Sequence, residues 1–498
     1  MTKKELFCEK NGKLHVGHTI LTGFAFLASS IAWAIYDPYI TKILNRLLTE
    51  SSWISGLSQS LNEAFPVLAE FAKTQGQDVN AAGGGITLVP LFIGIIMTFD
   101  NIFGVIFQPT FGKLSDRCRS KLGKRRPFIV FGAPVSALLF AIIPWVALTN
   151  SLPATMVFII LFVFSMSLWR APAVALMPAL TPPALRSEGN AIINLMGGVG
   201  SVVGMVAGSL VSAIYLLVNG VRATAENEQT TIFPYVFLVG GIVMVIGMLV
   251  ILTTVKEPSS LIAEGVNRMA DEDAKAARLA EKAAKKAEKE ARKQQKLSKG
   301  ERKSLICMLG GLFFLFCGTN AITTFFALFA SEVLGKSTSE ATIMTTLFAV
   351  CSAIAAIPAG KMGKKLGRKK TILIGLVIFM AVFLMYVLTG SMALIWVALI
   401  FGGFANMLIT VNTLPLVLDI GGIDKVGTFT GYYYTATFSA QIASPIIYGI
   451  VRMLTGTYLS LFIYSPIMFI LSILFILFVK HGEAVPDEIV KKIAEEND

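Results

Sequence analysis

Charged residues are scarce in this sequence: Asp, Glu, Lys and Arg make up 15% of its 498 residues, whereas hydrophobic residues make up 54%. Soluble domains carry about 25% charged residues and roughly 45–50% apolar ones. The mean hydropathy is +0.70, and almost no hydrophilic stretch is long enough to form a domain. These deficits exclude a soluble enzyme, a secreted scaffold and a nucleic-acid-binding domain, and they predict a polytopic membrane protein.

Histidine and cysteine are also rare, which limits the chemistry available to the chain. The three histidines lie outside the apolar cores of the spans, and the five cysteines show neither paired nor metal-like spacing. The sequence contains no nucleophile–base pair and no cofactor-binding loop. We therefore expect no enzymatic activity, no metal, no cofactor and no histidine relay inside a membrane.

The formal net charge of +12 does not indicate a nucleic-acid partner. Most Lys and Arg residues lie in short clusters between apolar runs and in one linker, which is the distribution that orients a membrane protein. The loops around 112–126 and 361–370 are rich in cations, whereas loops 149–152, 219–231 and 390–391 have few or none. The positive-inside rule then predicts that both termini and the linker are cytoplasmic, with the lipid bilayer of the cell membrane as the surroundings.

Apolar runs of helical length recur along the whole chain. A bilayer core about 30 Å thick needs roughly 20 apolar residues in a helix. This criterion predicts an all-α membrane protein with twelve spans, six before and six after a polar linker. The first span is long enough to be an uncleaved anchor rather than a signal peptide. The predicted spans are 17–41, 86–111, 127–148, 153–178, 189–217, 232–254, 305–331, 339–360, 370–389, 392–418, 427–451 and 458–479.

The linker at 256–303 is rich in Ala, Lys and Glu, and pairs such as Glu281–Lys285 have the i,i+4 spacing that favours an exposed helix. It is interpreted as a solvated spacer, with a partner-binding or lipid-contacting helix as the alternative. The predicted organisation is therefore an N-terminal bundle at 1–255, the linker at 256–303, a C-terminal bundle at 304–480 and a cytoplasmic tail at 481–498.

An internal repeat relates the two bundles. The motif KLGKRR at 121–126 follows the second span, and KLGRKK at 365–370 follows the eighth. Two parallel six-helix halves joined by a long linker resemble the major facilitator superfamily, which implies twelve helices in two pseudo-symmetric bundles and alternating access to a central site. The stretch GKLSDRCRSKLGKRRPF at 112–128 resembles the cytoplasmic gating motif of that superfamily. This resemblance implies gating roles for Asp116, Arg117, Arg125 and Arg126, and a weaker role for the incomplete second copy.

Three stretches resemble plant sucrose transporters and their relatives among the glycoside–pentoside–hexuronide:cation symporters. They are GVIFQPTFGKLSDRCRSKLGKRRPFI (104–129), SSIAWAIYDPYI (29–40) and WRAPAVALMPAL (169–180). The resemblance implies cation-driven, usually proton-driven, uptake of a sugar, often a disaccharide such as sucrose or maltose. In that family the arginine at the position of Arg170 is thought to bind substrate and to sense the coupling carboxylate.

Three ionisable residues stand out inside the predicted spans, where a lone charge costs at least about 2.5–3.5 kcal/mol. They are Asp37, Asp100 and Arg170. Two acids and one arginine leave a surplus carboxylate, and an unpaired buried carboxylate takes up a proton. We therefore expect proton coupling, with Asp37 or Asp100 as the carrier and Arg170 tuning it, while sodium binding is the alternative.

The sequence also departs from its relatives at the coupling site. Plant members carry an acid about three turns before the arginine, where this chain has Ile159 and Ile160. Melibiose-type sodium symporters carry acids in the second span, where this chain has Gly104 and Gln108. The identity of the ion therefore stays open between H⁺ and Na⁺.

The candidate substrate-binding residues are polar or aromatic groups within the spans. Asp100, Gly104 and Gln108 share one face of the second span at i, i+4 and i+8. Amides offer donors and acceptors, and aromatic faces pack on pyranose rings, although interhelical hydrogen bonding explains such residues equally well. Asn320, Thr413 and the tyrosines 432–434 also carry polar groups in the C-terminal half. The proposed set comprises Trp33, Gln108, Trp169, Arg170, Asn412 and Gln441.

The leading hypothesis is thus a monomeric sugar:proton symporter. The alternatives are a sodium-coupled sugar symporter, an exporter of amphipathic compounds and a non-transporting membrane sensor that signals through the linker.

Overall fold

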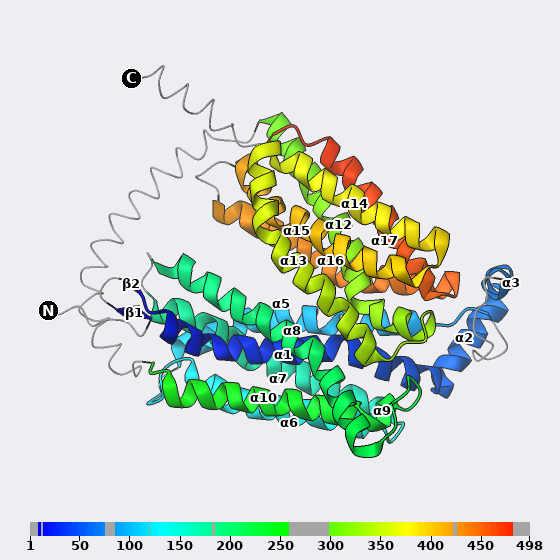
Figure 1. Cartoon of the computed structure of the whole chain (residues 1–498), viewed down its shortest axis with the longest axis horizontal. Helices are drawn as coiled ribbons and strands as arrows, with labels where there is room; N and C mark the ends of the chain where they lie inside the picture. Colours follow the sequence, from blue (N-terminus) through cyan, green and yellow to red (C-terminus); the bar gives the residue numbers. More distant parts are fainter. Residues whose placement is uncertain are drawn as a thin grey trace. The chain divides into compact units, whose positions relative to one another are not determined.

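The computed structural model describes residues 8–10, 13–74, 85–118, 120–181, 185–257, 298–421 and 426–481. Most of the predicted linker at 256–303 and nearly all of the predicted tail at 481–498 lie outside these residues, so the helical pairs expected in the linker are not described. The regular secondary structure of the described part is helical apart from one antiparallel pair of two-residue strands, in which Glu9 is paired with Leu14. Figure 1 shows the helices along the chain.

Long helices dominate the described chain, and eleven of them are long and apolar enough to cross a membrane. The remaining predicted span, the eleventh at 427–451, falls on α16, a 30-residue helix that is less apolar because it carries several Thr, Tyr and Ser residues. The elements are β1 (Glu9–Lys10), β2 (Lys13–Leu14), α1 (Val16–Thr49), α2 (Ser52–Ala64), α3 (Pro66–Thr74), α4 (Val89–Ile96), α5 (Phe99–Arg117), α6 (Arg126–Ala147), α7 (Leu152–Leu180), α8 (Arg186–Asn219), α9 (Glu228–Thr231), α10 (Phe233–Thr254), α12 (Lys299–Glu332), α13 (Thr338–Leu366), α14 (Arg368–Thr389), α15 (Met392–Gly421), α16 (Val426–Thr455), the 3₁₀ helix η3 (Tyr458–Ser460) and α17 (Leu461–Leu477).

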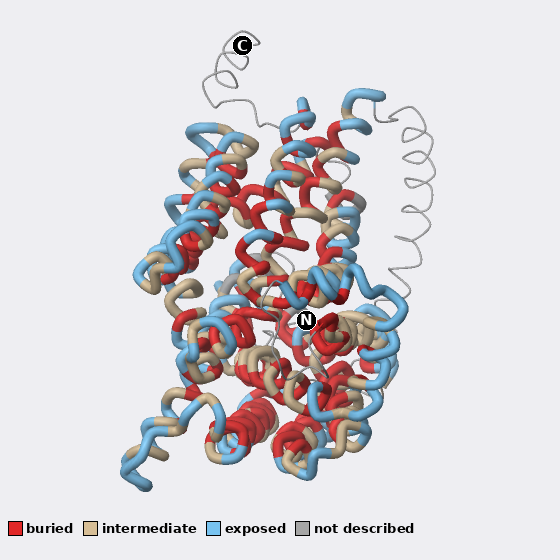
Figure 2. Tube along the Cα trace, turned by 90° about the vertical axis from the view of Figure 1, so that its right-hand side faces the viewer, coloured by how far each residue is buried: buried red, intermediate tan, exposed pale blue. Residues whose placement is uncertain are grey.

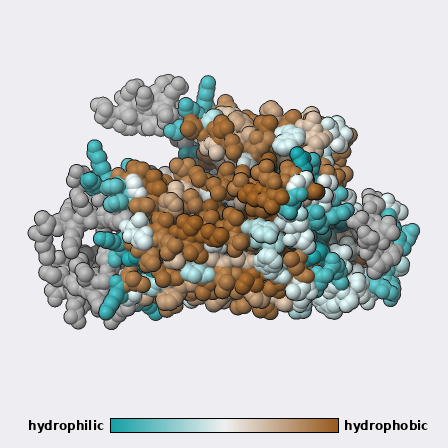
Figure 3. Space-filling model, turned by 60° about the horizontal axis from the view of Figure 1, so that its bottom comes forward, coloured by the Kyte–Doolittle hydropathy of each residue, from teal (hydrophilic) through white to brown (hydrophobic). Residues whose placement is uncertain are grey.

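Burial along these helices follows the pattern of a membrane bundle. Buried and exposed stretches alternate within single helices, as Figure 2 shows. Many of the exposed residues are large and apolar, for example Phe131 and Leu217. On the face drawn in Figure 3, hydrophobic residues cover the middle of the helices, and hydrophilic residues gather toward the ends. Apolar side chains on the outer surface of a bundle are what lipid tails require.

The chain divides into two compact units. The first comprises 1–36 and 99–296, and the second comprises 37–98 and 297–498. In the first unit α6 packs on α7 and α10, and the Phe140 ring meets the tilted rings of Phe162 and Phe237 at centroid distances of 4.9 and 4.5 Å. Glycines on α8 let its backbone approach α1: a Cβ on Gly204 would lie 2.7 Å from the Ile31 carbonyl oxygen. Such small residues are the usual means of close helix packing in membranes.

In the second unit α12 is the common packing partner of α16 and α17. Serines of these two helices donate hydrogen bonds to carbonyl oxygens of α12, from Ser444 to Cys317 at 2.6 Å and from Ser472 to Gly311 at 2.8 Å. Both serines are buried. Hydroxyl-to-carbonyl bonds of this kind hold helices together where no water competes for the carbonyl.

The second predicted span is interrupted in the structure. Residues 86–111 were expected to form one helix with Asp100 near its middle, but α4 ends at Ile96 and α5 begins at Phe99. Asp100 therefore lies in the first turn of α5, where backbone N–H groups lack intrahelical acceptors and the helix dipole favours a negative charge. Asp100, Gly104 and Gln108 still share one face, because all three lie on α5.

Candidate functional site

The predicted site residues Trp33, Asp100 and Arg170 come together in the first unit. They lie on α1, α5 and α7, respectively. The guanidinium carbon of Arg170 stands 5.6 Å from the centroid of the Trp33 ring, a cation–π distance. Arg170 is also close enough to Asp100 for their charges to attract each other. The three helices thus place a carboxylate, a guanidinium and an indole in one cluster.

Neighbouring side chains contact two residues of this cluster, Asp100 and Trp33. Asn101 donates a hydrogen bond from Nδ2 to Oδ1 of Asp100 at 3.0 Å. The Trp33 ring meets the edge of Tyr36 at 5.2 Å and lies 6.1 Å from the Phe162 ring. Its Nε1 atom is buried and has no hydrogen-bond partner within the described residues. A buried donor without a partner calls for an explanation, such as a ligand or a water.

The other predicted residues on these helices have different surroundings. Gln108 is half-buried, two turns beyond Asp100 on the same face of α5. Asp37 is half-buried one turn beyond Trp33 on α1 and is grouped with the second unit. Both therefore remain predictions, Gln108 as a substrate contact and Asp37 as a possible ion carrier.

Trp169 packs inside the first unit. Its side chain is buried, and Nε1 donates to Ser136 Oγ at 3.0 Å, which in turn donates to Ser165 Oγ at 2.9 Å. The Trp169 side chain lies against Gly132 of α6. Trp169 thus holds α7 on α6 one position before Arg170, and we leave it out of the substrate site proposed below.

Enlarging Gly132 should loosen this contact. A Cβ at Gly132 would lie 2.7 Å from Trp169 Cβ, so Gly132→Ala should lower stability by about 1–3 kcal/mol through overpacking. Gly198→Ala is the matched control, since a Cβ there meets nothing within 4 Å and alanine favours helix. The thermal unfolding midpoint of the purified protein is the measurement. Equal midpoints for the two variants would show that Trp169 is not tightly packed.

The predicted polar residues of the second unit fall into two groups, which differ in their contacts. Asn412 is buried and donates from Nδ2 to the carbonyl oxygens of Leu408 at 2.9 Å and Ala359 at 3.3 Å, so it ties α15 to α13. Its amide nitrogen is thereby occupied, and we leave Asn412 out of the substrate site as well. Gln441 is half-buried on α16 and stays a prediction.

Asn320, Thr413 and Tyr433 form the second group. The hydroxyl groups of Tyr433 and Thr413 lie 3.5 Å apart, and the Tyr433 ring meets the edge of Phe316 at 6.5 Å. Phe316 lies one turn before Asn320 on α12. The Asn320 Nδ2 atom is buried without a hydrogen-bond partner in the described part of the chain. These residues offer the donors and the aromatic face expected of a polyol contact.

The predicted gating residues form a network at the end of the first unit that carries the basic loop. Arg125 pairs with Asp116 at 2.7 Å and with Glu257 at 3.5 Å. One Glu257 oxygen also accepts the backbone N–H groups of Arg125 at 2.9 Å and Arg126 at 3.2 Å. The Arg126 guanidinium donates to the Leu252 carbonyl oxygen at the end of α10. Arg117 is exposed at the end of α5.

Sequence reasoning missed Glu257, which is the centre of this network. Its side chain is 5% exposed, and it sits against Gly123, whose φ of +107° disfavours other residues. The available signal was an acid directly after the sixth span, facing a loop crowded with cations. In the second unit, Arg368 of the second basic motif pairs with Asp419 near the end of α15.

Removing the Glu257 carboxylate should destabilise the first unit. Glu257→Ala leaves two backbone N–H groups and Arg125 without this acceptor, and hydrogen bonds to a charged group contribute about 1.5–3 kcal/mol each. We expect a lower thermal midpoint for Glu257→Ala than for Glu226→Ala, which removes an exposed carboxylate from a loop of the same unit. Identical midpoints would contradict the central place of Glu257 in the network.

Comparisons with known proteins give the family. The model of the family described as MFS/sugar transport protein matches residues 85–466, more than half of the chain. A sucrose transport protein of Arabidopsis thaliana, SUC3, is 31% identical over 137 residues; the match covers 24% of this chain and 23% of that relative. The chain thus matches less than a quarter of the length of that curated relative.

Solved structures give the same fold. The xylose transporter XylE from E. coli, in an inward-open conformation, superposes with a TM-score of 0.58 at 17% sequence identity. The match covers 94% of this chain and 96% of the XylE chain. The nucleoside transporter NupG has a TM-score of 0.57 at 13% identity, covering 92% and 100%. At these identities the likeness concerns the fold, which is the predicted major facilitator fold. Together with the family match, this shows that the chain belongs to the MFS/sugar transport protein family, multi-pass membrane proteins without enzymatic activity.

Proposed function

We propose that this chain is a secondary active transporter that takes up a sugar by alternating access. The cluster of Trp33, Asp100 and Arg170 carries the proposal, since it places three groups able to bind a polyol and an ion within membrane-spanning helices. The guanidinium presents a planar fork of donors that suits adjacent sugar hydroxyls. The family and the named sugar transporters among its relatives support a sugar as substrate.

The coupling ion proposed is a proton, carried by Asp100. When Asp100 is ionised, its negative charge attracts Arg170 and competes with the substrate for the guanidinium. A proton on Asp100 removes that charge and leaves the Arg170 donors available to sugar hydroxyls. Proton and sugar then favour each other's binding, as linkage between two sites requires. Asp37 is the alternative carrier, and Na⁺ is the alternative ion.

We further propose that the protein lies in the cell membrane with its basic loops facing the cytoplasm, and that it acts as a monomer. The distribution of Lys and Arg supports the orientation. A disaccharide such as sucrose or maltose is the proposed substrate, because a relative that matches part of this chain is a sucrose transport protein.

Uptake of radiolabelled sucrose and maltose into proteoliposomes tests this function. We expect saturable uptake that excess unlabelled substrate competes away. Uptake no faster than in empty vesicles for every sugar tested would overturn the proposal and leave the exporter and sensor hypotheses.

A further inference from the structure

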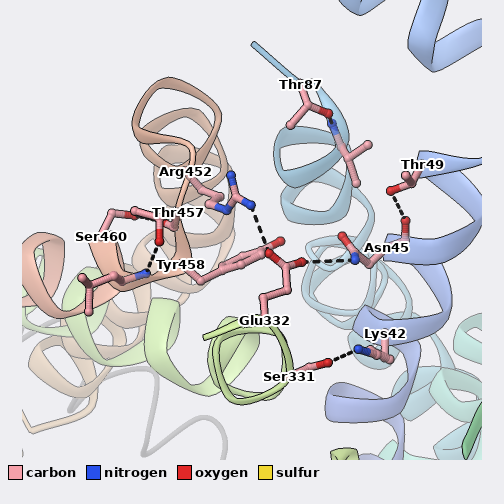
Figure 4. A network of polar contacts seen from close by, with 12 residues as sticks. Lys42, Asn45, Thr49, Thr87, Ser331, Glu332, Arg452, Thr457, Tyr458 and Ser460 are labelled. Atoms are coloured by element: carbon pink, nitrogen blue, oxygen red, sulfur yellow. Dashed lines mark hydrogen bonds and ion pairs between the residues drawn. The ribbon is translucent and has the colours of Figure 1, made fainter. Parts of the chain in front are cut away.

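A chain of polar contacts in the second unit joins the later half of α1 to α12 and, through α12, to α16 (Figure 4). At its centre is Glu332, the last residue of α12. One of its carboxylate oxygens accepts from the Arg452 guanidinium at 3.1 Å, and the other accepts from Asn45 Nδ2 at 3.3 Å. A single carboxylate therefore ties the first span of the chain to α12 and α16.

Two further contacts continue along the same face of α1. Lys42 donates to the Ser331 hydroxyl, next to Glu332, and the Tyr39 hydroxyl lies 3.4 Å from that of Ser339 on α13. Residues 39, 42 and 45 are spaced by three, so they lie on adjacent turns of one helical face. Tyr39 and Ser339 are buried, which places the inner end of this row away from water.

Arg452 explains why an acid stands at position 332. Its side chain is 7% exposed and lies over the Tyr458 ring, with the guanidinium carbon 4.3 Å from the centroid. A buried guanidinium is costly unless a carboxylate pairs with it. Glu332 supplies that charge and remains 26% exposed, so it can hold Arg452 while releasing Asn45 to water.

The second span approaches the same helices through glycines rather than polar groups. A Cβ on Gly449 of α16 would lie 2.7 Å from the Pro90 carbonyl oxygen of α4, and a Cβ on Gly94 would collide with the Pro445 carbonyl. The backbones of α4 and α16 are thus in direct contact. Two helices that cross in this way can come together without large side chains between them, and they can separate without breaking ion pairs.

We infer that these contacts form a gate at the end of the second unit opposite its own basic segment at 361–370, with Glu332 as the acceptor that latches α1 when the gate is shut. This inference rests on the proposed transport cycle, which requires the first two spans to part from α12, α13 and α16 on one side. Hydrogen bonds at a partly exposed position contribute only about 0.5–1.5 kcal/mol net, because water replaces them. A latch made of them can open in every cycle.

Thiol accessibility tests the latch without needing a substrate. Ile43 is 1% exposed on α1, between Lys42 and Asn45. In a full-length variant whose five native cysteines are replaced by serine or alanine, Ile43→Cys should react slowly with a membrane-impermeant maleimide in proteoliposomes. Adding Glu332→Gln should speed labelling by about tenfold, the equivalent of roughly 1.4 kcal/mol. Adding Asn45→Ala should speed labelling by a smaller factor.

Glu340→Gln is the matched control, since Glu340 is an exposed capping residue of α13 that pairs with Lys336. It should leave the labelling rate of Cys at 43 unchanged. Labelling at the parent rate in both Glu332→Gln and Asn45→Ala would overturn the latch. If Glu332→Gln does not fold, the labelling rate of the Asn45→Ala variant alone tests the latch. Absence of sugar uptake by the parent protein would instead contradict the proposed function, so the two failures are distinguishable.

Discussion

Arg170→Lys is expected to reduce the kcat/KM of sugar uptake by about 10- to 100-fold. Lysine keeps the positive charge but loses the planar fork that donates to two acceptors at once. Hydrogen bonds to a charged group contribute about 1.5–3 kcal/mol, and about 1.4 kcal/mol corresponds to a factor of ten. The measurement is initial uptake against sugar concentration in proteoliposomes containing equal amounts of protein.

The matched control is Arg222→Lys, which makes the same change at an exposed position in a loop of the first unit. Its uptake should equal that of the parent protein. Thermal unfolding of the purified variants distinguishes lost binding from lost folding. Unchanged uptake kinetics in a folded Arg170→Lys variant would remove Arg170 from the substrate site.

Asp100→Asn should abolish accumulation of sugar against its gradient while permitting exchange of labelled for unlabelled sugar. The asparagine amide is close in shape to a protonated carboxyl but does not bind or release a proton. It also removes the charge that attracts Arg170. The variant therefore behaves permanently like the protonated transporter. Because it neither takes up nor releases a proton during the cycle, the proton gradient cannot drive its transport of sugar.

Asp37→Asn makes the same change at the other candidate carrier. If Asp100 is the carrier, Asp37→Asn retains accumulation driven by a pH gradient. The reverse pattern would assign the carrier to Asp37. Full accumulation by both variants would show that neither carboxylate couples transport to protons.

Much of the fold was predictable because a bilayer demands long apolar helices. Eleven of the twelve predicted spans coincide with helices long and apolar enough to cross, and the repeated KLG motifs fall at the starts of equivalent helices, α6 and α14. The interruption at residues 97–98 was not predictable from local propensity. Neither Met97 nor Thr98 is a helix breaker, and the chain turns there without a glycine or a proline.

The site was predictable in part, for a related reason. The cost of a charge in a membrane span singled out Asp100 and Arg170, and the structure places them near each other with Trp33. The direction in which a side chain points depends on the rotation of its helix, which sequence does not give. Trp169 and Asn412 were therefore indistinguishable from substrate contacts, although their polar atoms are bonded within the bundle. Glu257 was missed because its partners lie more than 130 positions away in the chain.

Sugar accumulation under a single imposed ion gradient tests the central claim, that Asp100 and Arg170 couple sugar uptake to protons. Proteoliposomes are loaded at alkaline pH and diluted into acidic medium without sodium, and internal labelled sugar is followed over time. The account predicts transient accumulation above the external concentration, which a protonophore abolishes and Asp100→Asn lacks. Accumulation driven by a sodium gradient alone, with no response to the pH gradient, would contradict it.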